Sequence, residues 1–447
     1  MSKTNILFVL ALGFCLLFTT QMEARKWTLQ ECLDYALKHN VTLRQNVLTK
    51  TSAHESVLQS QAELFPSVNA STSQNLSYTP FPQIGRATVT NGYVTSSVDK
   101  VSYNGMYAIN FNWTIWNGNQ NRMKIRQNKL TEQQAAIDSA ITANSIQEQI
   151  AQIYIQILYT AEAIKVNQQS LVWSKENEER GKTMVDVGTF SKADLSQLTA
   201  QRASDEYNVV AQQSNLRNYT RQLKQLLEIT DDEFEVAIPD QLDGNALAEI
   251  PKLQVVYERA LTSRPEMKGK QLAVEAGELS IKQAKAQHLP TIGLNGGVSS
   301  NVTTMSSNAY GTQLKNSLAG TIGVTVSIPI WDQRQTRTAV NKARIALENS
   351  QLALQNQRTQ LYSTIENYWI QASTNQAKYK SAVINSESQQ TSYEMLSEQF
   401  RLGLKNIVEL REGMNNLITA RQNELQSKYL TLYNLQMLNF YKNGQVK

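Results

Sequence analysis

The fold is decided by residues 107–115, YAINFNWTI, in which large apolar side chains alternate with small or polar ones. Residues 322–330, IGVTVSIPI, alternate in the same way. Strict alternation over about ten residues predicts a β-strand with one apolar face and one polar face. A weaker partner strand is expected before each of them. The sequence therefore predicts two strand pairs, over residues 66–116 and 290–331.

The two strand pairs belong to two copies of one unit. Pro66 aligns with Pro290, and further along the chain Trp116 aligns with Trp331. The second copy is shorter only between the proline and the tryptophan, which predicts a surface loop at that place. The repeated unit is far longer than the repeats of solenoid arrays, so the chain is a duplication.

The domain division follows from this duplication. Residues 1–24 are expected to be a secretory signal, because an almost unbroken apolar run follows a basic start and Ala24 offers a small residue for cleavage. The first repeat covers 25–232 and the second covers 253–447, with a linker at 233–252 that contains proline and glycine. Each repeat is predicted to contain a helix, a strand pair and a long helical hairpin.

Long helices are predicted after each strand pair. No proline occurs between Gly118 and Gly188, a length of about 105 Å if the helix is continuous. Apolar residues spaced by three and four positions predict coiled-coil packing along it. Gly188 and its counterpart Gly403 are expected to end the long helices, and Ser191 and Asn406 to cap the helices that follow. Gly188 and Gly403 are therefore predicted at the tips of two hairpins.

Several function classes are excluded by composition and motifs. The net charge of +5 is spread out with no basic patch, so nucleic acid is not expected as a partner. The three histidines are scattered, and zinc-ligand spacings, phosphate-binding glycine loops and nucleophile elbows are missing. We therefore expect no enzyme, no catalytic residue, no cofactor and no metal site. After residue 24, Cys32 is the single cysteine and no apolar run reaches about 18 residues.

A two-faced strand of this length suits an outer-membrane β-barrel in contact with lipid. Trp113, Trp116 and Trp331 lie at one end of the strands, where an aromatic girdle is expected. Four strands cannot close a barrel, and an open edge in lipid costs several kcal/mol for each unsatisfied backbone group. Three chains would supply twelve strands and a water-filled pore, whereas the eight strands of two chains would be plugged by side chains.

This order of features resembles the TolC-type outer-membrane efflux protein family. The resemblance rests on WTLQEC at 27–32, the duplicated helix that ends at a proline, PIWD at 329–332, and the paired glycines. It implies a mainly α fold with a β-barrel portion. In this fold a homotrimer forms a twelve-strand outer-membrane barrel, four strands per chain, continuous with a long periplasmic α-helical barrel. It also implies a channel that passively conducts substrates from a periplasmic adaptor protein and an inner-membrane pump to the exterior.

The resemblance also implies functional residues near the second-repeat glycine. Glu409 and Glu412 occupy the places of the family's acidic pore selectivity ring. Asp194 and Lys405 occupy the places of a gate latch that ties the first hairpin to the second. Phe400 stands where the family usually has tyrosine, so a hydrogen bond from that hydroxyl is not expected.

An exported coiled-coil scaffold or adhesin without channel activity is the alternative. Such a protein predicts a continuous heptad pattern and a strand region that is not duplicated. The duplicated strand pairs therefore favour the channel.

Overall fold

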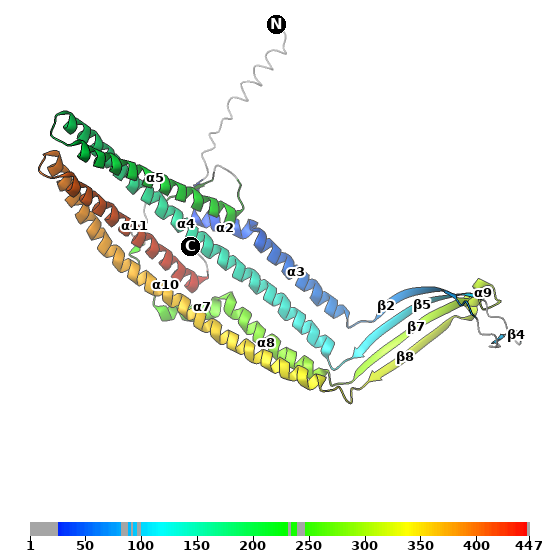
Figure 1. Ribbon diagram of the computed structural model, residues 1–447. Coiled ribbons are helices and arrows are strands. Elements are labelled where there is room, and N and C mark those ends of the chain that lie inside the picture. Colours follow the sequence, from blue (N-terminus) through cyan, green and yellow to red (C-terminus); the bar gives the residue numbers. More distant parts are fainter. Residues whose placement is uncertain are drawn as a thin grey trace, which may run out of the picture. The chain divides into compact units, whose positions relative to one another are not determined.

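The computed structural model describes residues 26–81, 88–90, 93–95, 100–230, 234–238 and 246–444. The predicted signal at 1–24 and part of the predicted linker lie outside these residues. The described chain forms two compact units, each of which takes segments from both sequence repeats (Figure 1). The helical unit contains residues 26–46, 138–268 and 356–444, and the sheet unit contains residues 47–137 and 269–355.

The order of elements repeats along the chain. The first repeat consists of α2 (Leu29–His39), α3 (Val41–Ala62), β2 (Ser67–Tyr78), β5 (Val101–Trp116), α4 (Gln120–Asp186) and α5 (Lys192–Leu227). The second repeat consists of α7 (Leu253–Ser263), α8 (Pro265–Ala286), β7 (Thr291–Thr303), β8 (Ala319–Ser327), α10 (Gln335–Arg401) and α11 (Ile407–Asn443). A short helix, α9 (Tyr310–Asn316), is added between β7 and β8. These elements confirm the predicted mainly helical fold with four long strands.

Two short sheets complete the described structure. Strand β1 (Lys26–Trp27) pairs in parallel with β6 (Glu235–Val236). Strand β3 (Thr88–Thr90) pairs antiparallel with β4 (Tyr93–Thr95) between β2 and β5. Across the described ranges, none of the helices combines the length and the apolar character needed to cross a membrane.

Local sequence signals explain several boundaries. Thr28 and Glu31 form a reciprocal capping box that starts α2. Pro265 opens α8, a position where its missing N–H costs nothing. The alternating pattern predicted a strand up to Ile330, but β8 ends at Ser327. Pro329 explains this shorter strand, because a proline has no N–H to donate to the ladder.

The four long strands form one antiparallel sheet in the order β2-β5-β7-β8. The central contact pairs β5 with β7, so the sheet joins the two repeats. Strands β2 and β8 each have one neighbour within the described chain, which leaves both edges of the sheet open.

Candidate functional site

The sheet has one apolar face and one polar face. Directly opposed residues of antiparallel strands lie on the same face, and the register opposes Ile109 to both Ala70 and Val298. The apolar face carries Val68, Ala70, Ile109, Phe111, Trp113, Trp116, Ile292, Leu294, Val298, Ile322, Val324 and Val326. The polar face carries Ser67, Asn69, Ser71, Asn110, Asn112, Thr114, Asn295, Ser299, Thr321 and Thr325.

Both faces of the sheet are exposed along β8. On the apolar side of β8, Ile322 is 75% exposed and Val324 is 65% exposed. Strands β2, β5, β7 and β8 contain no charged residue. An uncharged sheet with an exposed apolar face and a polar opposite face can separate hydrocarbon from water.

A bulge near the end of β5 places two tryptophans on the same face. Trp113 opposes Leu294 and Trp116 opposes Ile292, because the register shifts between Thr114 and Trp116. In a regular strand, residues three positions apart would lie on opposite faces. Both predicted girdle tryptophans of β5 therefore belong to the apolar face.

The predicted girdle residues Trp113 and Trp331 differ in their surroundings. Trp113 Nε1 donates to the carbonyl of Leu64 over 2.8 Å. Trp331, the third predicted girdle residue, follows β8 and is 84% exposed. An apolar body with a polar N–H is the combination found at membrane–water boundaries.

The tips of the two helical hairpins have matching geometry. Gly188 ends α4 with φ +76° and Gly403 ends α10 with φ +74°. At each tip the glycine N–H and the next N–H donate back to carbonyls three and five residues earlier, which is a Schellman motif. No atom lies within 4 Å of a Cβ built at either glycine, so the positive φ alone requires glycine. Both glycines thus lie where the sequence predicted hairpin tips.

The two hairpins pack against each other within the helical unit. Phe400 is 1% exposed and belongs to a buried cluster with Leu198, Tyr393, Ile407, Leu410, Met414 and Leu417. The ring of Phe190, at the first tip, meets that of Phe400 edge to face at 6.1 Å. Phe400, for which no hydroxyl hydrogen bond was expected, is thus held by apolar packing.

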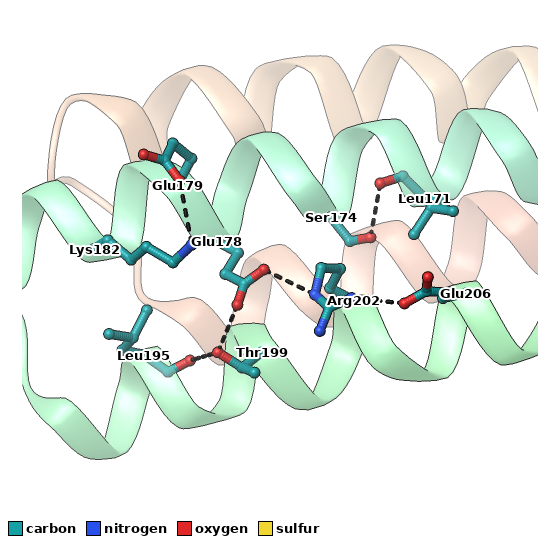
Figure 2. Close-up of polar contacts among 9 residues, drawn as sticks. All are labelled: Leu171, Ser174, Glu178, Glu179, Lys182, Leu195, Thr199, Arg202 and Glu206. Carbon is teal, nitrogen blue, oxygen red and sulfur yellow. Dashed lines mark hydrogen bonds and ion pairs between the residues drawn. The ribbon is translucent and has the colours of Figure 1, made fainter.

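Polar contacts join α4 to α5 behind the first tip, as Figure 2 shows. Glu178 of α4 binds Arg202 of α5 at 2.9 Å and accepts from the Thr199 hydroxyl at 2.9 Å. Arg202 also binds Glu206, one turn along α5, at 2.7 Å. Because Glu178 is only 12% exposed, this pair is better shielded from water than an ordinary surface ion pair.

The predicted acidic ring residues differ in their contacts. Glu409 caps α11 by accepting from the Asn406 N–H at 3.2 Å, and it also pairs with the Lys405 ammonium. The hydrogen bond from Lys405, followed by that from Asn406, lowers the pKa of Glu409. Glu412 is exposed and forms no ion pair or hydrogen bond with the described residues. Of the two, only Glu409 has an ion-pair partner among the described residues.

The predicted latch residues do not meet within the described part of the chain. The Asp194 carboxylate accepts from the Ser191 hydroxyl at 2.6 Å at the start of α5. Lys405 pairs with Glu409 four residues along its own hairpin. In this structure each of the two side chains thus has a partner within its own hairpin.

Asp205 is a buried acidic residue that the sequence patterns did not single out. It lies on α5 with 3% exposure and accepts from Gln201 Nε2 at 3.2 Å. Burial raises the pKa of its carboxyl group. The sequence indicates this burial, because Asp205 lies on one helical stripe with the apolar residues Leu198 and Val209.

Metal ligands are not gathered in any part of the chain that the structure describes. No group of three or more His, Cys, Asp or Glu side chains there could hold a metal ion. Cys32 is buried and forms no disulfide with the described residues. Burial raises the pKa of its thiol to about 12.

Comparisons with known proteins agree on one family. The family model described as outer membrane efflux protein matches residues 32–228 and 256–443. The outer membrane efflux protein BepC of Brucella suis biovar 1 is 20% identical over 337 residues, which cover 73% of this chain and 69% of that protein. The outer membrane protein TolC of Escherichia coli K12 is 25% identical over 272 residues, which cover 56% of this chain and 51% of that protein.

A solved structure shares the fold of the described chain. It is the crystal structure of the CmeC outer membrane channel of Campylobacter jejuni, with a TM-score of 0.76 and 18% sequence identity. The match covers 93% of this chain and 86% of that one.

Proposed function

Because this chain belongs to the outer membrane efflux protein family and is an outer-membrane channel, we propose that three copies share one β-barrel and one periplasmic tunnel. The family consists of transport channels and is not an enzyme family. The tunnel passively conducts substrates to the exterior, and a periplasmic adaptor and an inner-membrane pump deliver them.

The two open edges of the sheet carry this proposal. Within the described chain, strands β2 and β8 each have a neighbour on one side only, and the apolar face of the sheet is exposed along β8. In lipid each unsatisfied backbone group costs several kcal/mol, so the edges must pair with further strands. Placing β8 of one copy beside β2 of the next satisfies both edges. Three four-stranded sheets give twelve strands, enough for a water-filled lumen.

The trimer is tested by native mass measurement of the purified protein in mild detergent. We expect one species with three times the mass of the mature chain, because only the closed barrel pairs the backbone groups at every sheet edge. A stable monomer or dimer would contradict the proposal. The same measurement addresses the scaffold alternative, since an exported coiled-coil protein would remain in solution when the detergent is removed.

The acidic residues of the second hairpin determine ion preference in the proposed channel. Three copies of Glu412 and of Glu409 form rings around the periplasmic constriction, where they attract cations and repel anions. Because Lys405 lowers the pKa of Glu409, this carboxylate stays ionised to a lower pH than an ordinary glutamate. Lys405 also compensates its charge, so Glu412 contributes more to selectivity. When the gate closes, Lys405 leaves Glu409 and pairs with Asp194.

Planar-bilayer recordings test this arrangement. Glu412→Gln should lower the cation-to-anion permeability ratio by about tenfold, and Glu409→Gln should lower it less. Lys405→Ser should raise conductance through loss of the latch while leaving cation preference in place. Glu424→Gln, farther along α11, is the matched control and should change neither quantity. Unchanged selectivity in the double variant Glu409→Gln/Glu412→Gln would mean that both residues merely lie on a solvated helix face.

A further inference from the structure

Helix α9 packs against the apolar face of the sheet. Ser300 opposes Tyr107 in the register and so shares its face, and its hydroxyl donates to the carbonyl of Leu314 over 2.7 Å. The hydroxyl groups of Tyr107 and Tyr310 lie 2.7 Å apart. Since side chains of the apolar face make these contacts, α9 lies on that side of the sheet and not over the polar face.

The position of α9 along the strands corresponds to one border of the apolar band. Tyr107 opposes Ser300, whereas Trp116 opposes Ile292 at the other end. The eight residue steps from Ile292 to Ser300 span about 27 Å along the strand, or about 20 Å along the membrane normal at a barrel tilt of about 40°. This height is comparable to the band of about 25 Å that lipid covers in outer-membrane barrels. The tyrosines thus mark the border opposite to the tryptophans.

The outward side of α9 is polar, and its flanks are apolar. Gln313, Leu314 and Ser317 contact β7 or its neighbouring loop, which leaves Thr312 and Lys315 exposed on the other side. Tyr310 at its start is 50% exposed and Leu318 after its end is 64% exposed. A polar outer side with a basic residue, flanked by exposed tyrosine and leucine, suits the boundary between hydrocarbon and headgroups.

We propose that α9 is an interfacial helix that lies in the headgroup layer of the outer leaflet, on the lipid-facing side of the barrel. This inference rests on the proposed function, which places the apolar face in lipid and the β7–β8 connection at the exterior. Tyr310 and Leu318 contact the upper acyl region, and Lys315 meets anionic headgroups. As a consequence α9 anchors the rim of the barrel and does not obstruct its opening.

Nitroxide labels on single introduced cysteines test the location of α9 in liposomes. Cys32 is buried, so the introduced cysteine is the one that reacts. Labels at Thr312→Cys and Lys315→Cys should relax strongly when the liposomes contain lipids with nickel-chelating headgroups. Two labels on adjacent residues of β8 serve as controls. A label at Val324→Cys should respond mainly to oxygen in the hydrocarbon, and one at Thr325→Cys to a water-soluble nickel chelate.

The outcomes separate the two proposals. If Val324 and Thr325 respond as expected but the α9 labels respond only to the soluble chelate, α9 lies in water and the inference is wrong. If the α9 labels are shielded from headgroup nickel and their attachment reduces conductance, α9 lies over the opening and the inference is equally wrong. If Val324 and Thr325 do not differ from each other, the sheet does not separate lipid from water, and the proposed barrel itself fails.

Discussion

Val324→Lys is expected to prevent assembly of the protein in the outer membrane, whereas Thr325→Lys, one residue further along β8, leaves assembly intact. Val324 opposes Leu294 on the apolar face and is 65% exposed there. A lysine in the lipid band of a barrel costs up to about 2–4 kcal/mol at the midplane and less toward the borders, and the proposed trimer contains three copies. Such a loss is a large share of the stability of an ordinary protein.

Thr325 is the matched control because it lies next to Val324 on the same edge strand, β8, and at a similar depth. Its hydroxyl donates to Asn295 Oδ1 over 3.2 Å on the polar face, where a lysine ammonium meets water. Membrane fractionation and native gel mobility measure assembly of both variants. The proposed orientation of the sheet would be reversed if Thr325→Lys abolished assembly and Val324→Lys did not.

Phe400→Ala is expected to destabilise the packing between the two hairpin tips by about 3–5 kcal/mol, the usual loss for a buried aromatic ring. Phe400 is 1% exposed and lies among the side chains that join the hairpins, including Phe190, Leu410 and Met414. The cavity left by the ring lies beside the tips, so the tips should open locally before the protein unfolds as a whole. In the proposed channel this opening raises conductance.

Limited proteolysis and thermal unfolding measure this effect. The connection 402–406 should be cleaved much faster in Phe400→Ala, and Phe400→Leu should recover part of the protection because it refills most of the volume. Leu404→Ala is the control: Leu404 is 71% exposed at the same tip, and its loss should change stability by about 0.5 kcal/mol or less. Equal cleavage of the two alanine variants would show that the cluster does not hold the tips together.

The sequence by itself determined the elements whose signals are local. Period-two alternation at 107–115 identified β5, because the pleat sends successive side chains to opposite faces. Gly188 and Gly403 identified the hairpin tips, because few other residues adopt a positive φ without strain. The duplication then supplied each signal twice. This repetition explains why the family could be recognised although its relatives share little sequence identity.

Only the tertiary structure decided which groups meet. The pairing of β5 with β7, the bulge that brings Trp113 and Trp116 to one face, and the contact of α9 with Tyr107 depend on residues far apart in the chain. The ion pair of Arg202 with Glu178 was also not predictable, because it joins α5 to α4 and only the packed hairpin brings the two side chains within reach. Periodicity specifies the face on which a side chain lies, whereas register, burial and ion-pair partners follow from the packing of distant segments.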